Sequence, residues 1–168
     1  MWILVRTVTY ATLFVGLLLV FLPTRLLAWS GITRMPNLGI PQVLGILVTA
    51  IGAAIALWCI FTFAFIGKGT PAPFDPPRRL VVRGPYRFVR NPMYIGAALA
   101  LFGAAVFYES IPLLIYVALF VVITHLFVVL YEEPTLSRTF GQHYHVYRKK
   151  VRRWLPSVRN QEKNTVDR

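Results

Sequence analysis

The residues from Val43 to Gly67 form an unbroken apolar run in which no side chain carries a charge. A helix needs about 20 such residues to cross the hydrocarbon core of a bilayer. Backbone N–H and C=O groups find no partners in lipid, so a run of this kind must form a helix there. The chain is 57% hydrophobic and only 14% charged, whereas about a quarter of the residues of a soluble domain are charged. We therefore predict an integral membrane protein.

Three further apolar runs are candidates for membrane-spanning helices: Val8–Leu22, which can extend to Trp29, Met93–Tyr108, and Ile111–Tyr131. The run Met93–Tyr108 is short for a span, which predicts a thin, tilted or partly re-entrant crossing. Glu109 and Ser110 connect it tightly to the following run, so these two helices should form an antiparallel hairpin. The predicted fold is all-α, a multi-pass transmembrane bundle of about four spans.

The 18 Lys and Arg residues are distributed unevenly and contribute to a net charge of +12. Six lie between Lys68 and Arg90, and nine lie after Tyr131. Two predicted spans separate these segments, so both segments lie on one side, which the positive-inside rule makes cytoplasmic. Both termini are then cytoplasmic, and in a bacterial cell the membrane is the inner one. Basic residues at this face attract anionic lipid headgroups, which explains the charge without nucleic-acid binding.

The connection over residues 67–92 is the only long one, and its six prolines prevent a continuous helix. An ordered loop of this length in a small protein is usually functional. After Pro134, apolar residues recur at three- or four-residue spacing between basic ones, which predicts an amphipathic helix over residues 134–156. The chain therefore divides into a first span with its outer loop (1–42), a core of three spans (43–156) and a polar tail (157–168).

Polar residues collect at the open end of the predicted hairpin. The run RGPYRFVRNPMYIG, residues 83–96, leads into one helix, and Glu132-Glu133 ends the other. Adjacent carboxylates point about 100° apart on a helix, so they should serve two separate contacts. On their own they would cap the helix and pair with loop arginines, but Arg87, Arg90 and Tyr94 beside them favour a pocket for a polar ligand. No metal site is predicted, because paired cysteines and a His-x-x-x-His spacing are missing.

The chemistry of this pocket is compatible with several ligands. Carboxylates accept hydrogen bonds from ribose hydroxyls or an amino group, and arginines hold a carboxylate. Tyrosine rings attract a cation such as a sulfonium by about 0.5–2 kcal/mol each. S-Adenosylmethionine carries all of these groups, but the residues alone do not select it. His125, two helical turns before Glu132, either orients a polar group here or is hydrogen-bonded within the bundle.

The segments GPYRFVRNPMYIG and EEPTLSRTFGQHYHVYRKKVRRWLP resemble the membrane methyltransferases that include isoprenylcysteine carboxyl methyltransferase and phosphatidylethanolamine N-methyltransferase. The resemblance covers residues 67–156 and follows the motif order G-x-G, G-x-Y-x-x-x-R-[HN]-P-x-Y-x-G, E-E and F-G-x-x-Y-x-x-Y. It implies a methyltransferase whose loop and C-terminal helix form a pocket for S-adenosylmethionine. The residues implied to bind the cofactor are Gly67, Gly69, Leu80, Val81, Tyr86, Arg90, Asn91, Pro92, Met93, Tyr94, Glu132 and Glu133.

The resemblance also bears on the methyl acceptor, which should be a lipophilic small molecule or a lipid-linked group. The isoprenylcysteine enzymes typically carry His where Asn91 stands and Arg where Val128 stands, so a carboxylate, an amine and a thiol all remain open. Methyl transfer requires an in-line approach to the sulfonium methyl, and the protein contributes alignment and desolvation. Glu132 is the predicted catalytic residue, acting as base or orienter.

Two other interpretations remain open from the sequence. One is a membrane reductase of the steroid-reductase type, which would use NADPH and hold its 2′-phosphate with the loop arginines. The other is a non-enzymatic helical bundle whose basic loops bind lipid headgroups or a partner. The order of the motifs favours the methyltransferase over both.

Overall fold

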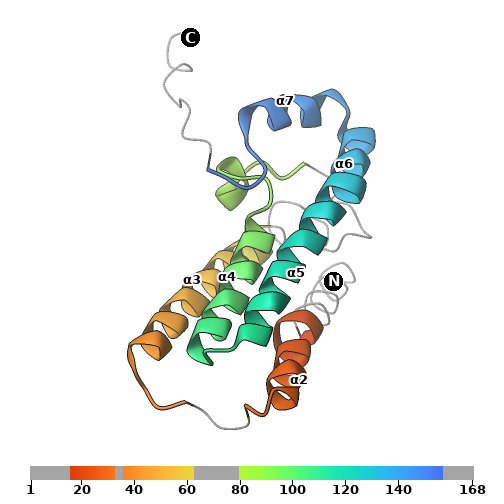
Figure 1. Ribbon diagram of the computed structural model, residues 1–168. Coiled ribbons are helices and arrows are strands. Elements are labelled where there is room, and N and C mark those ends of the chain that lie inside the picture. The colour runs from red at the N-terminus through yellow and green to blue at the C-terminus, as the bar shows by residue number, and fades with distance from the viewer. Residues whose placement is uncertain (1–15, 33–35, 63–79, 157–168) are drawn as a thin grey trace, which may run out of the picture.

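The computed structural model describes residues 16–32, 36–62 and 80–156. Within these ranges every regular element is helical (Figure 1), so the predicted all-α class is confirmed. The elements are the π-helix η1 (Gly16–Phe21), α2 (Leu22–Trp29), α3 (Ile40–Thr62), the 3₁₀ turn η3 (Gly84–Arg87), α4 (Pro92–Phe107), α5 (Ile111–Phe127), the π-helix η4 (Val128–Glu132), α6 (Glu133–Phe140) and α7 (Gln142–Lys150).

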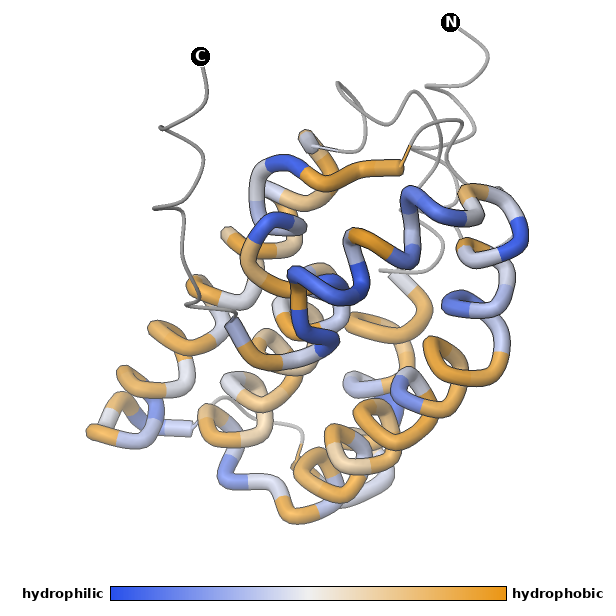
Figure 2. Tube along the Cα trace, turned by 90° about the horizontal axis from the view of Figure 1, so that it is seen from above, coloured by the Kyte–Doolittle hydropathy of each residue, from blue (hydrophilic) through white to orange (hydrophobic). Residues whose placement is uncertain are grey.

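Two helices are long and apolar enough to cross a membrane, namely Ile40–Thr62 and the continuous helix Ile111–Phe140. Two of the four predicted spans are thus supported by helix length and composition. The helix α4 has 16 residues, which agrees with the short third run. The first run is described only from Gly16 to Trp29, where it is a shorter apolar helix. Figure 2 shows hydrophobic residues along the bundle helices and hydrophilic residues in the segments over one end.

Glycines allow α3 and α4 to pack backbone against backbone. Gly45 and Gly52 on α3 face Gly103 and Gly96 on α4. A Cβ atom at Gly52 would lie 2.5 Å from the Gly96 carbonyl oxygen, and one at Gly96 would lie 2.8 Å from that of Gly52. Neither position has room for a methyl group, so the helices approach more closely than larger residues permit. These contacts hold the two helices antiparallel, with Gly96 in the first half of α4 against Gly52 in the middle of α3.

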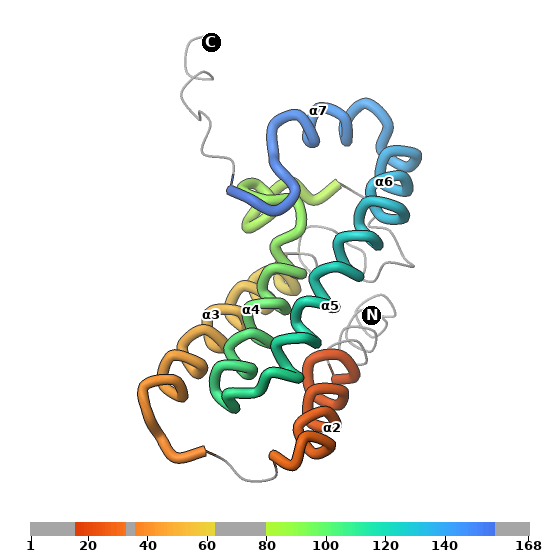
Figure 3. The backbone as a smooth tube through the Cα atoms, in the orientation of Figure 1, coloured from red at the N-terminus to blue at the C-terminus, as the bar shows by residue number. Residues whose placement is uncertain are grey.

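The tight turn between α4 and α5 is formed as predicted. The Ser110 Oγ caps α5 by accepting a hydrogen bond from the Leu113 N–H at 3.3 Å. The Gln42 Nε2 donates to the Glu109 Oε1 at 2.8 Å and to the Phe107 carbonyl at 3.1 Å, which ties the start of α3 to the same turn. The tube in Figure 3 shows the resulting arrangement, with α3, α4 and α5 side by side and the open end of the hairpin under α7.

The prediction of one amphipathic helix over residues 134–156 is wrong. The helix that begins as α5 does not end at Tyr131. It continues through the wide π turn η4, which precedes Pro134, and ends at Phe140. Gly141 then adopts φ 50 and ψ −124, a backbone conformation that favours glycine, and breaks the helix. The helix α7 turns back over the end of the bundle and stops at Lys150. Val151 has extended dihedrals of φ −120 and ψ 128.

Candidate functional site

The open end of the α4–α5 hairpin joins the two polar clusters identified in the sequence. The Tyr94 hydroxyl, in the first turn of α4, donates to the Glu132 Oε2 at 3.2 Å. The predicted adjacency of these two segments is therefore confirmed, although they are 38 positions apart in the chain. Glu132 is the last residue of η4. π-Helical turns are rare and frequently occur at functional sites.

Glu133 has different surroundings from its neighbour. The Arg153 Nε donates to the Glu133 Oε1 at 2.6 Å, and the Arg153 Nη2 donates to the Oε2 at 3.0 Å. The Arg90 Nη1 lies 3.1 Å from the Oε1, and the side chains of Arg90 and Glu133 are only 10% and 9% exposed. Two arginines thus occupy both oxygens of one buried carboxylate. The prediction that the two glutamates serve separate contacts is confirmed.

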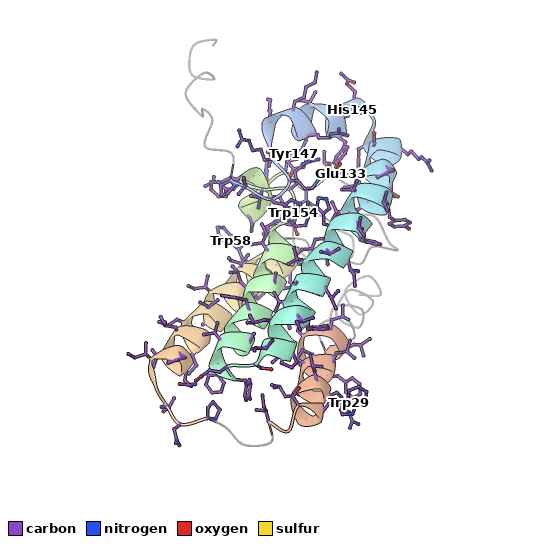
Figure 4. All side chains as sticks on the ribbon, viewed as in Figure 1. Trp29, Trp58, Glu133, His145, Tyr147 and Trp154 are labelled. Atoms are coloured by element: carbon purple, nitrogen blue, oxygen red, sulfur yellow. The ribbon has the colours of Figure 1, made fainter. Side chains whose placement is uncertain are left out.

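Two tyrosines of α7 complete the site from above. The Tyr147 hydroxyl donates to the Tyr86 carbonyl at 2.6 Å, and the Tyr144 hydroxyl accepts from the Arg90 Nη1 at 3.2 Å. Burial raises the pKa of Tyr147, so its phenol stays protonated and keeps donating. Figure 4 shows Glu133 and Tyr147 close together where α6, α7 and the start of α4 meet. The i, i+3 spacing places both tyrosines on one face of α7.

A small cavity lies between these groups. Its walls come from the loop, from the continuous helix and from α7: Arg90, Asn91, Val128, Glu132, Glu133, Leu136, Tyr144 and Tyr147. It has about 20 Å³ of room, which is about enough for one water molecule. The Arg90 Nε is buried and has no hydrogen-bond partner among the described residues. A buried donor without a partner is costly, so Arg90, which lines this cavity, carries a donor that an acceptor would stabilise.

The predicted cofactor residues fall into three groups. Arg90, Asn91, Glu132 and Glu133 line the cavity, and Tyr94 is bonded to Glu132. Leu80, Val81, Tyr86, Pro92 and Met93 pack nearby without lining it: Leu80 lies against Tyr144, Tyr147 and Val151, and Pro92 is buried at the start of α4. The side chains of Val81, Tyr86 and Met93 pack around Cys59. Gly67 and Gly69 lie outside the described residues.

Sequence reasoning missed several residues of the site. Tyr144 and Tyr147 belong to the F-G-x-x-Y-x-x-Y motif, so the motif already contained a signal for them. Leu136 lies one turn after the glutamates and was recognisable only once the helix was known to continue. Val128, one turn before them, was recognised only as the position where the isoprenylcysteine enzymes carry Arg. Arg153 had no signal, because nothing in the local pattern separates it from the adjacent Arg152.

His125 is hydrogen-bonded within the protein. The Trp154 Nε1 donates to the His125 Nδ1 at 3.0 Å, and the two ring centroids are 5.9 Å apart. This supports the interpretation of His125 as a bonded histidine of the bundle. Over residues 16–32, 36–62 and 80–156, no group of His, Cys, Asp and Glu side chains could hold a metal ion.

Comparison with known proteins gives one match. A family model described as phospholipid methyltransferase matches residues 40–143. The matched region begins with α3 and ends at the start of α7, so it contains Arg90, Tyr94 and both glutamates. No curated protein and no solved structure matches the chain.

Proposed function

Since the chain belongs to the phospholipid methyltransferase family, we propose that it transfers a methyl group from S-adenosylmethionine to a lipid-soluble or lipid-linked acceptor in the membrane. The observation that carries this proposal is the state of Glu132. Among the described residues, its carboxylate is bonded to the Tyr94 hydroxyl and to no cation. The two nearby arginines pair with Glu133. The Glu132 carboxylate therefore remains available to a ligand or a reacting group.

The residues present fit the chemistry of this cofactor. Its carboxylate is an acceptor for the buried Arg90 Nε, and its amino group or ribose hydroxyls are donors for Glu132. The side chains lining the cavity must separate to admit a molecule of this size, because the cavity has about 20 Å³ of room. When bound, S-adenosylmethionine supplies a methyl group on a sulfonium centre.

The contribution of the protein to the reaction is alignment, desolvation and proton handling. Tyr94 holds the Glu132 carboxylate in place from α4. An amine or thiol acceptor must lose a proton to attack, and Glu132 is the group placed to accept it. Val128 is only 1% exposed and lines the cavity, so it offers an apolar wall to the part of the acceptor beside it.

The acceptor and the cofactor should reach the site by different routes. Leu130 and Tyr131, next to Glu132, are 72% and 43% exposed. Both belong to a helix apolar enough to span a membrane, so this face is open to the bilayer, from which a lipid acceptor can enter laterally. The basic segments around the loop and α7 face the aqueous side, from which the charged cofactor can enter.

Cofactor binding tests the proposal directly. We expect detergent-solubilised protein to bind S-adenosylhomocysteine saturably in a calorimetric titration and not to bind NADPH. The Glu132→Gln variant should bind at least about 10-fold more weakly, because a charge-assisted hydrogen bond is lost. Glu109→Gln is the matched control, since Glu109 lies in the turn at the other end of the hairpin and the amide can still accept from Gln42.

Two results would contradict the proposal. One is equal affinity of the wild type and Glu132→Gln for S-adenosylhomocysteine, and the other is saturable binding of NADPH in place of S-adenosylhomocysteine.

The acceptor class is then tested with methyl-labelled S-adenosylmethionine and three acceptors offered separately: an aminophospholipid, a prenylated cysteine and a lipophilic thiol. Transfer to the aminophospholipid is the outcome we expect, because the matching family model is that of phospholipid methyltransferases and Val128 offers no cation to a carboxylate acceptor.

A further inference from the structure

The two neighbouring glutamates differ in what remains available on each carboxylate. Both oxygens of Glu133 accept from Arg153, and one of them is also 3.1 Å from Arg90. A bidentate arginine pair of this geometry is among the stronger polar contacts in proteins. Glu132 accepts from a neutral tyrosine hydroxyl at 3.2 Å. A ligand can therefore reach Glu132 without breaking an ion pair, but it must displace Arg153 to reach Glu133.

Arg153 belongs to a short non-helical segment after α7, which we call the strap (Val151–Leu155). The strap runs alongside the loop that carries Arg90 and Asn91, with a parallel β-bridge between Val89 and Arg152. Its backbone accepts two hydrogen bonds from that loop, from the Arg90 N–H to the Arg152 carbonyl at 2.9 Å and from the Asn91 Nδ2 to the Arg153 carbonyl at 3.3 Å. Its side chains bind the long helix, since Arg153 pairs with Glu133 and Trp154 donates to His125.

The strap thus joins two elements that form separate walls of the cavity. The loop side supplies Arg90 and Asn91, and the helix side supplies Val128 and Glu132. In Figure 4, Trp154 lies near Glu133, where the strap meets the long helix. Glu133 is the one described residue that pairs with arginines from both the loop and the strap.

We propose that Glu133 is a positioning residue that acts through Arg153. It holds the strap across the site and keeps Arg90 in place, while Glu132 alone presents its carboxylate to the ligand. The ligand part of this proposal rests on the proposed function. Neutralising Glu133 leaves two buried or half-buried guanidinium groups without their counter-charge, so the strap should detach and the wall formed by the loop should lose its orientation.

A double-mutant cycle separates this role from direct ligand contact. The variants are Glu133→Gln, Arg153→Gln and the double variant, and the first readout is the affinity for S-adenosylhomocysteine. We expect each single variant to bind at least about 10-fold more weakly than the wild type. In the Arg153→Gln background, the Glu133→Gln change should weaken binding clearly less than it does in the wild type, because only the contact with Arg90 remains to be lost. Arg152→Gln is the matched control, because Arg152 is adjacent, exposed and contacts the loop through its backbone carbonyl.

Hydrogen exchange supplies a readout that does not depend on the ligand. In the ligand-free protein, Glu133→Gln and Arg153→Gln should both speed exchange in peptides covering the strap and residues 88–91. Glu132→Gln and Arg152→Gln should leave it unchanged. Peptides from α3 and α4 report whether each variant is folded. If Arg153→Gln unfolds, the milder Arg153→Lys replaces it, since lysine keeps the charge but loses the bidentate contact.

The outcomes separate the two proposals. Affinity losses that multiply in the double variant would show that Glu133 touches the ligand directly and would overturn the inference. Unchanged exchange of the strap in Glu133→Gln would overturn it as well. If the wild type does not bind S-adenosylhomocysteine, the proposed function fails, and the exchange data alone then decide whether Glu133 holds the strap.

Discussion

At the scale of single residues, the site depends on an uneven distribution of charge between neighbours. Arg90 and Arg153 pair with Glu133, and Glu132 is paired with Tyr94 instead. Burying a charge is costly unless it is paired and hydrogen-bonded, so the ion-pair cluster satisfies one carboxylate fully and leaves the other available. Arg90, which lines the same cavity, adds an unsatisfied donor, its Nε.

The Nε of Arg90 gives a prediction at this scale. Arg90→Lys keeps the positive charge near Glu133 but removes the planar fork and its Nε donor. We expect the affinity for S-adenosylhomocysteine to fall about 10-fold or more, with the protein still folded. Calorimetry measures the affinity, and Arg87→Lys is the control, because Arg87 is exposed and its guanidinium lies 4.4 Å from the Phe88 ring centroid. Equal affinity of the Arg90→Lys variant and wild type would show that the Nε does not bind the ligand.

At the scale of elements, the site depends on how closely α4 and the long helix are held. The glycine contact fixes α4 against α3, and the turn at Ser110 sets α5 beside α4. The π turn η4 carries Glu132, and Gly141 sends α7 back over the cavity. The residues of the site lie on different elements. A displacement of any one of these elements therefore changes the distances between site residues.

The glycine contact gives the prediction at this scale. Gly52→Val should destabilise the protein by at least about 2 kcal/mol, because the new side chain meets the backbone of α4 and a Cβ there would lie 2.5 Å from the Gly96 carbonyl oxygen. Ala53→Val is the matched control, since Ala53 is exposed on the same helix. Reversible unfolding in mixed detergent measures both variants. Equal stability of the two would mean that α3 and α4 do not pack as described.

At the scale of the whole molecule, the polar segments gather at one end of an apolar bundle. The loop residues 80–91 and the segments after Glu133 lie together at the open end of the hairpin (Figure 1), and Gln42 and Glu109 meet at the other end. From the charge distribution and the positive-inside rule, we propose that the first of these ends faces the cytoplasm. Large apolar side chains along α3 and α5 are exposed, as lipid-facing residues are: Val43, Leu44, Leu47, Ile51, Trp58, Ile115, Leu119 and Ile123.

Cysteine labelling tests this orientation. In a Cys59→Ala background, a cysteine at Lys149 should react with a membrane-impermeant maleimide only from the cytoplasmic side, and one at Leu38 only from the opposite side. Lys149 lies on α7, and Leu38 is 78% exposed in the segment before α3. Intact cells and inverted vesicles give the two sides. Labelling of both positions from one side would show that the bundle does not cross the membrane.

Local patterns determined the class of the protein and the adjacency of its two polar clusters. Apolar runs in lipid can only become helices, and a two-residue connection can only return as a hairpin, so Tyr94 and Glu132 had to meet. The motif order likewise identified the family. These conclusions depend on neighbours along the chain, which the sequence contains directly.

Only the tertiary structure decided how the glutamates divide their contacts. The pairing of Glu133 with Arg153 needs the break at Gly141, the return of α7 and the extended strap, and none of these follows from a periodic pattern. Arg152 and Arg153 are the same residue type, yet one is exposed and the other is paired. The difference arises from long-range geometry, because which arginine reaches a buried carboxylate depends on the path of the backbone across the site.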